Sequence, residues 1–183
     1  MQLIPTDIPA VKLIVPKKFG DHRGFFSEVY SRKALAELGI NCEFVQDNHS
    51  LSVEKSVLRG LHYQVEPMAQ DKLVRVVHGA ILDIAVDIRR DSPTFGKHVS
   101  AVISAENWQQ IFVPTGFAHG FVTLQPNTEV LYKVTKYYSP THERGIRWND
   151  PKLAIKWGID EAQAILSNRD REHPMLAEAK DLF

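Results

Sequence analysis

The chain has 183 residues, 44% of them hydrophobic and 24% charged, which suits one folded domain with a core and excludes wholesale disorder. Lys plus Arg and Asp plus Glu number 22 each, so no overall charge is available to hold nucleic acid or an anionic membrane. The single cysteine, Cys42, excludes an internal disulfide and favours a reducing compartment.

The N-terminal stretch, MQLIPTDIPAVKLIVP, does not have the pattern of a signal peptide. It lacks a charged start, and Pro5, Asp7 and Pro9 interrupt its apolar run. No apolar run elsewhere approaches the ~20 residues needed to cross a bilayer. We therefore expect a soluble protein of the cytoplasm, with neither a membrane nor a nucleic acid as partner.

The dominant hydrophobic period along the chain is two, which is typical of strands. A short helix is expected at 32–38, between Ser31 as N-cap and Gly39 as stop. Strands are expected at 57–64, 72–77, 81–88, 98–104, 110–113, 120–124 and 130–135. In the strand at 81–88, one face carries Leu82, Ile84, Val86 and Ile88, and the other carries Ile81, Asp83, Ala85 and Asp87. Two helical stretches, 160–165 and 171–181, are expected in the tail.

This element order predicts a mainly β protein. Many short strands separated by Gly and Pro turns favour a sandwich, a jelly roll or a small barrel. No internal repeat, low-complexity segment or linker divides the chain. We expect one domain over residues 1–183, with a mostly helical C-terminal appendage from about residue 150 and few helices elsewhere.

The segment VLRGLHYQ, residues 57–64, places polar side chains in an otherwise apolar strand. Arg59 and His62 are three residues apart, so in a regular strand their side chains would point to opposite faces. Gly60 between them permits a bulge that lets both face one cavity. A lone histidine in a strand is usually structural. A barrel interior that accepts Arg and His together indicates a binding cavity, because an unpaired buried charge is costly.

The next strand adds a candidate cation. Lys72 shares a face with Val74 and Val76, so an inward face would place Lys72 at the mouth of a cavity. An exposed lysine at a strand start is the alternative. Asp83, on the polar face of the following strand, could pair with Lys72 or with Arg75.

The segment VPTGFAHGF, residues 113–121, sets His119 between the small residues Ala118 and Gly120, with space to meet a ligand. Metal-binding jelly rolls commonly use a His-x-His pair with a carboxylate. No His-x-His, His-Glu-x-x-His or Cys-x-x-Cys occurs in this chain. We therefore expect no metal, although three dispersed ligands could still meet in space.

Two further segments carry candidate residues. Tyr132 and Tyr138 fall on one face of an extended strand pattern, where they are either packing residues or a proton donor and a stacking platform. Asp170 ends the segment LSNRD ahead of a helical stretch, as a helix cap or as a carboxylate that orients a histidine.

Taken together, these segments resemble one family, the dTDP-4-dehydrorhamnose 3,5-epimerases of dTDP-L-rhamnose synthesis. The resemblance runs from about residue 3 to residue 175. It rests on the stretches FGDHRGFFSEVY (19–30), FVQDNHS (44–50), VLRGLHYQ (57–64), DIRRDSPTFG (87–96), SAEN (104–107), VPTGFAHGF (113–121), LYKVTKYYSP (131–140), HERGIRWNDP (142–151) and LSNRD (166–170). It implies a cupin-type jelly roll (a double-stranded β-helix) that acts as a homodimer with no metal and no organic cofactor.

The resemblance also implies a set of roles. His62 would be the base, Tyr132 the acid and Asp170 the partner of His62. Lys72 would face the keto oxygen of the sugar. The remaining substrate contacts would come from Arg23, Phe26, Glu28, Gln46, Asn48, Arg59, His119, Tyr138, Glu143 and Arg169, of which Arg23 to Glu28 would reach the neighbouring subunit's site. The pattern common in the family has lysine where this chain has Arg169, which keeps the charge but changes its geometry.

The implied chemistry agrees with these residue types. The hydrogens on C3 and C5 of a 4-keto sugar lie alpha to the carbonyl, so a base can remove either one to give an enolate without a redox cofactor. Epimerisation then needs an acid on the opposite face and a cation or donor at the oxygen. The alternatives are a single-centre 3- or 5-epimerase, a 3,4-ketoisomerase, a non-catalytic sugar-nucleotide binding module and a metal-dependent cupin oxygenase.

Overall fold

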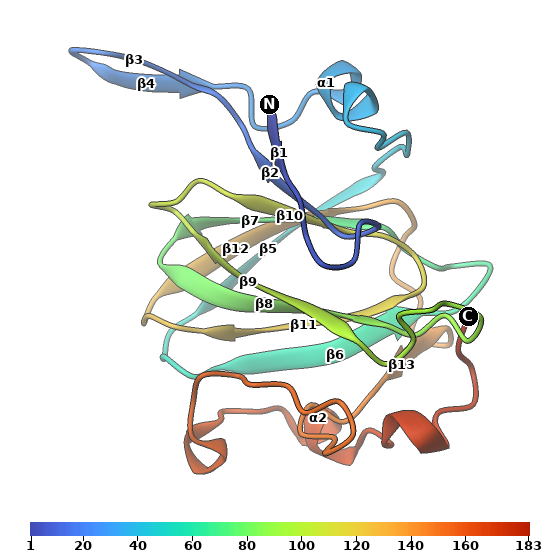
Figure 1. Ribbon diagram of the computed structural model, residues 1–183. Coiled ribbons are helices and arrows are strands. Elements are labelled where there is room, and N and C mark those ends of the chain that lie inside the picture. The colour runs from blue at the N-terminus through green and yellow to red at the C-terminus, as the bar shows by residue number, and fades with distance from the viewer.

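The computed structural model describes residues 1–183 and consists mainly of two antiparallel β-sheets stacked face to face (Figure 1). One sheet has the strand order β1 (Gln2–Ile4), β2 (Lys12–Val15), β10 (Gln110–Val113), β7 (Lys72–His78), β12 (Thr128–Val134), β5 (Gln46–Ser52). The other has the order β13 (Glu143–Gly145), β6 (Leu58–Gln64), β11 (Phe117–Thr123), β8 (Ala80–Asp87), β9 (His98–Ser104). The chain crosses between the two sheets repeatedly, and the result is a jelly roll, one of the three architectures that the strand pattern favoured and the one that the family resemblance implied.

The expected strands are all present, with small differences at their ends. Strands β9 and β10 have the predicted bounds, whereas β11 begins three residues earlier than expected and β12 is displaced toward the N-terminus. Strand β8 also has the predicted division of faces. Ile81 and Ala85 lie in the core between the sheets, and Ile84 and Val86 lie in a second core on the outer side.

The C-terminal segment covers the outer side of the five-stranded sheet (Figure 1). Trp148, Leu153 and Trp157 pack there against Ile84 and Val122. The expectation of a mostly helical appendage was wrong. The segment is largely irregular and contains only η1 (Glu161–Gln163), α2 (Asn168–Glu172) and η2 (Leu176–Glu178).

The helix expected at 171–181 does not form, because Pro174 has no N–H to donate and disfavours a helical conformation in the residue before it. Helix α2 accordingly ends at Glu172, and the next single turn, η2, begins after the proline. Of the stretch expected at 160–165, only the short turn η1 is helical.

Two elements lie on the other side of the molecule. Helix α1 (Arg32–Glu37) begins where the Ser31 side chain accepts a hydrogen bond from the Ala34 N–H, and its Leu35 packs on the outer face of the six-stranded sheet. Strands β3 (Lys18–Asp21) and β4 (Gly24–Ser27) form a hairpin that projects away from both sheets (Figure 1). None of the helices is long and apolar enough to cross a lipid bilayer.

Candidate active site

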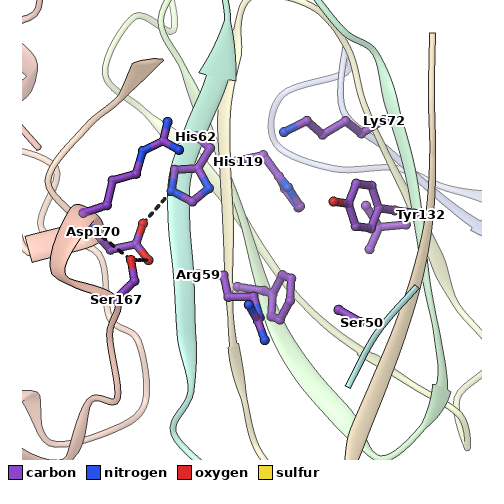
Figure 2. A pocket seen from close by; sticks show the side chains of 11 residues that line it. Ser50, Arg59, His62, Lys72, His119, Tyr132, Ser167 and Asp170 are labelled. Atoms are coloured by element: carbon purple, nitrogen blue, oxygen red, sulfur yellow. Dashed lines mark hydrogen bonds and ion pairs between the residues drawn. The ribbon is translucent and has the colours of Figure 1, made fainter. Parts of the chain in front are cut away.

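A cavity of about 310 Å³ opens between the two sheets (Figure 2). Its wall contains half of the candidate site residues that the sequence singled out. The lining residues are Ser50, Arg59, His62, Lys72, Val74, His119, Phe121, Tyr132, Ser167, Arg169 and Asp170. They come from both sheets and from α2, which the chain reaches only near its end.

The bulge expected at Gly60 is present. The register between β6 and β11 shifts, so that His62 pairs with His119 while Arg59 pairs with Phe121. A Cβ atom at Gly60 would lie 2.5 Å from the Cα atom of Gly120, so a larger residue there would collide with the neighbouring strand. This irregularity lets Arg59 and His62 both line the cavity despite their opposite parity.

His62 and Asp170 form a hydrogen-bonded pair. The Nε2 atom of His62 lies 2.5 Å from Oδ1 of Asp170, and the other carboxylate oxygen accepts a hydrogen bond from the Ser167 hydroxyl at 2.8 Å. The Ser167 hydroxyl also accepts a hydrogen bond from the Asp170 N–H. Ser167 therefore caps α2 and at the same time holds the Asp170 side chain in place. Asp170 therefore contacts a histidine, as one interpretation of the sequence had it, but it is not a helix cap, because Ser167 caps α2 and Asp170 lies within that helix.

The pKa of Asp170 is lowered. Burial is the largest contribution and acts to raise it, but the hydrogen bond from His62, the charge of His62 and the bond from Ser167 together outweigh burial. Asp170 is thus a buried carboxylate that stays ionised. It fixes the tautomer of His62, because it accepts a hydrogen bond from Nε2 and leaves Nδ1 without a protein partner.

Lys72 enters the cavity from β7 on the same face as Val74, as the alternation predicted. Burial, which disfavours the charged form, lowers the pKa of its ammonium group to about 8, although Glu143 and Asp83 act in the opposite direction. A lysine with this pKa is mainly cationic at neutral pH and loses its charge in mildly alkaline solution.

Asp83 does not pair with Lys72 or Arg75, so that expectation was wrong. Its carboxylate accepts instead from His119 Nε2, at 3.0 and 2.9 Å, and both side chains are buried. In the register of β8 and β11, Asp83 lies directly opposite Phe121. His119 is two residues from Phe121 on β11, so it is the diagonal neighbour of Asp83 on the same face of the sheet.

Tyr132 faces the cavity from β12, across from His62 (Figure 2). Burial raises the pKa of its hydroxyl, the nearby Arg59 lowers it and Glu143 raises it, with a net upward shift. Tyr132 is therefore held in its protonated form at neutral pH, as a proton donor must be before it reacts.

Tyr138 and Glu143 meet beside the cavity. Strand β12 ends at Val134, so Tyr138 does not continue its face, and the shared strand face expected for Tyr132 and Tyr138 was wrong. The exposed Tyr138 hydroxyl donates to Glu143 at 2.6 Å, and Arg169 forms an ion pair with the same carboxylate. Burial acts to raise the pKa of Glu143, but the bonds from Tyr138 and Arg169 lower it overall.

The other candidates lie outside the cavity wall. Gln46 and Asn48 share the face of β5 that carries Ser50, and the Gln46 amide donates to Asn48 at 2.8 Å. Arg23, Phe26 and Glu28 lie on or next to the projecting hairpin and are exposed, with Phe26 65% accessible. Arg23 forms an ion pair with Asp21 within the hairpin.

Sequence reasoning missed four residues at or beside the site: Ser50, Phe121, Ser167 and His173. Two signals were available. Ser50 follows Asn48 by two residues, so the two side chains lie on the same face of the strand. Ser167 precedes Asp170 by three residues, which is the spacing of a helix cap. Nothing in the local pattern marks His173, which follows α2 and whose ring lies 5.4 Å from that of His62.

One group of side chains has the spacing of metal ligands. The ligand atoms of His62, Asp170 and His173 all lie within 4.8 Å of one another. The three residues come from separate positions along the chain and form no recognisable motif. His119, the histidine that the sequence analysis considered as a possible ligand, is not among them.

Comparison with known proteins gives one consistent result. The family model described as dTDP-4-dehydrorhamnose 3,5-epimerase matches residues 5–178. The chain is 52% identical over 171 residues to the dTDP-4-dehydrorhamnose 3,5-epimerase of Shigella flexneri, covering 93% of each protein.

Two solved structures are also similar. The first is the dTDP-6-deoxy-D-glucose-3,5-epimerase of Legionella pneumophila in complex with dTDP-4-keto-L-rhamnose. It has a TM-score of 0.93 and 47% identity, covering 98% of this chain and 94% of that one. The second is the dTDP-4-dehydrorhamnose 3,5-epimerase of Bacillus anthracis with TDP and PPi bound, with a TM-score of 0.92 and 50% identity over 95% of this chain and 98% of that one.

Proposed function

The chain belongs to the dTDP-4-dehydrorhamnose 3,5-epimerase family and is an isomerase, and from this premise we propose that its cavity inverts C3 and C5 of dTDP-4-dehydro-6-deoxy-D-glucose through an enolate. The product is dTDP-4-dehydro-L-rhamnose. The observation that carries the proposal is the His62–Asp170 hydrogen bond on one side of a cavity whose other side carries the protonated Tyr132.

His62 acts as the base through Nδ1. The Asp170 carboxylate accepts from Nε2, so the free lone pair of the neutral ring is on Nδ1. When Nδ1 takes a proton from the sugar, the ring becomes cationic, and the ionised Asp170 stabilises that cation. Asp170 thus contributes to the reaction without losing or gaining a proton.

Tyr132 acts as the acid. It reaches the cavity from the six-stranded sheet, whereas His62 comes from the five-stranded sheet. A proton removed on one face of the sugar and a proton delivered on the other invert the carbon. Lys72 lines the same cavity and stabilises the charge that develops on the keto oxygen, and His119 lines it as a further substrate contact.

Charged and aromatic residues around the mouth bind the nucleotide end. Arg59 and Arg169, both exposed at the cavity, are suited to a diphosphate, because a guanidinium can form two parallel hydrogen bonds to phosphate oxygens. Tyr138 provides an exposed ring for stacking beside Glu143. Gln46 and Asn48 add amide donors and acceptors on the β5 face.

The protein is proposed to act as a homodimer in which the hairpin enters the partner's site. Arg23, Phe26 and Glu28 are exposed and outside the cavity of their own chain, which supports a role on another subunit. Light scattering should give about twice 20.8 kDa. A stable, fully active monomer would overturn this part of the proposal.

Residues 1–183 are proposed to fold as one domain, because the C-terminal segment shares a core with the five-stranded sheet. Chemical unfolding should then show one transition by both fluorescence and circular dichroism. The cytoplasm is the proposed site of action, since the free thiol of Cys42 stays reduced there.

Solvent exchange tests the reaction. Incubation of dTDP-4-keto-6-deoxyglucose with the enzyme in D₂O should give a product of the L-lyxo configuration that carries deuterium at both C3 and C5. Label and inversion at one centre would establish the single-centre epimerase, and a keto group at C3 would establish the ketoisomerase. Binding without exchange would leave only a binding module, and activity that a chelator abolishes would indicate a metal enzyme.

A further inference from the structure

His62, Asp170 and His173 form a compact group of three potential ligands at the wall of the cavity, which His62 and Asp170 line. Asp170 Oδ1 lies 2.5 Å from His62 Nε2 and 3.8 Å from His173 Nε2. Strand β6 supplies the first histidine, α2 the carboxylate and the chain after α2 the second histidine. The three ligand atoms converge on one point although 108 residues separate His62 from Asp170.

His173 is the unexplained member of the group. Its residue is only 8% exposed, and its Nε2 atom is buried without any hydrogen-bond partner. Buried polar atoms are nearly always satisfied, because an unsatisfied one loses the hydrogen bonds that water gave it. An imidazole nitrogen left unpaired beside a carboxylate and a second imidazole is therefore a nitrogen available to a ligand.

The fold makes room for this ring. Gly145 on β13 pairs in register with His62, and a Cβ atom at Gly145 would collide with three atoms of the His173 ring. Only a glycine at this position lets the ring lie against the strand next to the His62–Asp170 pair.

The donor set matches zinc. Two imidazole nitrogens and one carboxylate oxygen form a common three-residue zinc site whose fourth position is open, with bonds of about 2.0–2.2 Å. In tetrahedral geometry such bonds place the donors about 3.3 Å apart. The two distances at Asp170, 2.5 and 3.8 Å, lie on either side of this value, and all three ligand atoms lie within 4.8 Å of one another, so small side-chain movements would form the site.

We propose that His62, Asp170 and His173 form an inhibitory zinc site. Zn²⁺ takes the position of the proton that His62 Nε2 shares with Asp170, and that proton moves through solvent to Nδ1 of the same ring. The ring remains neutral, and no atom is oxidised or reduced. Zinc binding itself does not depend on the proposed function, whereas the inhibition rests on the proposed role of His62 Nδ1 as base, because a protonated Nδ1 cannot accept a proton from the sugar.

The test uses full-length enzyme dialysed first against a chelator. Zinc alone is added, bound zinc is measured by equilibrium dialysis, and turnover is measured at each free zinc concentration. We expect one zinc per chain and a saturable loss of kcat. His173→Leu, which replaces the unpaired nitrogen with apolar volume, should weaken both zinc binding and zinc inhibition at least tenfold, each variant being compared with its own activity in the absence of zinc.

His49→Ala is the matched control, because His49 is also paired with a carboxylate, that of Glu129 at 2.8 Å, but is exposed and outside the cavity. It should leave the zinc affinity unchanged. If His173→Leu folds poorly, His173→Gln serves in its place, and the zinc-induced rise in Tm, expected in the wild type and lost in the variant, gives a second measurement.

Absence of stoichiometric zinc binding, or equal zinc affinity in the wild type and the His173 variants, would overturn the site. Zinc that binds through His173 without reducing turnover would overturn the inhibition and also contradict His62 as the base. An enzyme that binds zinc through His173 but shows no exchange at C3 or C5 when zinc-free would overturn the proposed function alone.

Discussion

Tyr132 and His62 reach one cavity from opposite sheets of the jelly roll, Tyr132 from β12 and His62 from β6 (Figure 2). A planar enolate between them would present one face to each residue. The stacking of two sheets thus provides the geometry that the proposed inversion at carbon would require. It also means that the proposed acid and the proposed base can be altered separately, with different expected results.

Removal of the base should reduce turnover without preventing binding. His62→Asn is expected to lower kcat by about 10²–10⁴-fold and to change substrate affinity by less than about tenfold. Asp170→Asn should also lower kcat strongly, because an amide cannot stabilise the cationic ring as a carboxylate does. Ser167→Ala, which removes one hydrogen bond to Asp170, should have a smaller effect. Steady-state kinetics check this order, and near-normal turnover by His62→Asn would refute the assignment.

The two tyrosines should behave differently. Tyr132→Phe is expected to stop net epimerisation while some proton exchange at carbon persists, because His62 can return a proton to the face from which it came. Tyr138→Phe should keep most of kcat, since its hydroxyl bonds to Glu143 outside the cavity wall, and Tyr138→Ala should mainly raise KM. Product analysis and deuterium exchange separate these cases. Equal loss of kcat in both phenylalanine variants would contradict the division of roles.

The pH dependence of kcat/KM should follow the ionisation of the Lys72 ammonium group. Its lowered pKa of about 8 means that the ammonium is charged below this pH and neutral above it. If the charge stabilises the enolate as proposed, kcat/KM should fall as the pH rises through about 8. Lys72→Arg, whose guanidinium stays protonated, should lose this alkaline limb even if its maximal rate is lower. A profile that is flat to about pH 9.5 in the wild type would show that Lys72 is not needed as a cation.

The close contact at Gly60 should be visible in stability. Gly60 has φ of 126° and faces the backbone of Gly120, whereas Gly24 has φ of 131° and open space, with nothing within 4 Å of the position that a Cβ atom would take. Gly24→Ala should therefore cost only the conformational penalty, about 1–2 kcal/mol. Gly60→Ala should cost more than this, because it adds a collision with β11. Urea unfolding of the two variants measures the difference, and equal losses would mean that the strands adjust freely.

The strands could be predicted from the sequence because alternation is a local signal, and β8 shows it clearly. The irregular conformation of the C-terminal segment was not predicted. Its apolar pattern favoured a helix, and the effect of Pro174 on that helix was given too little weight. The hydrogen-bond partner of Asp83 could not be predicted either, because it depends on the register of two strands. The pairing of His62 with Asp170 came from family resemblance alone, since no local rule links residues that are 108 apart.

The position of Asp170 on α2 also has a consequence for biosynthesis. The ribosome makes the strand that carries His62 well before α2, since His62 and Asp170 are 108 residues apart. Because domains fold progressively as they emerge, the sheets can begin to associate while the partner of the base is still unmade. A nascent chain that ends ahead of α2 would thus hold much of the barrel without the proposed catalytic pair. Activity would then require that α2 has also been made and that Asp170 has reached His62.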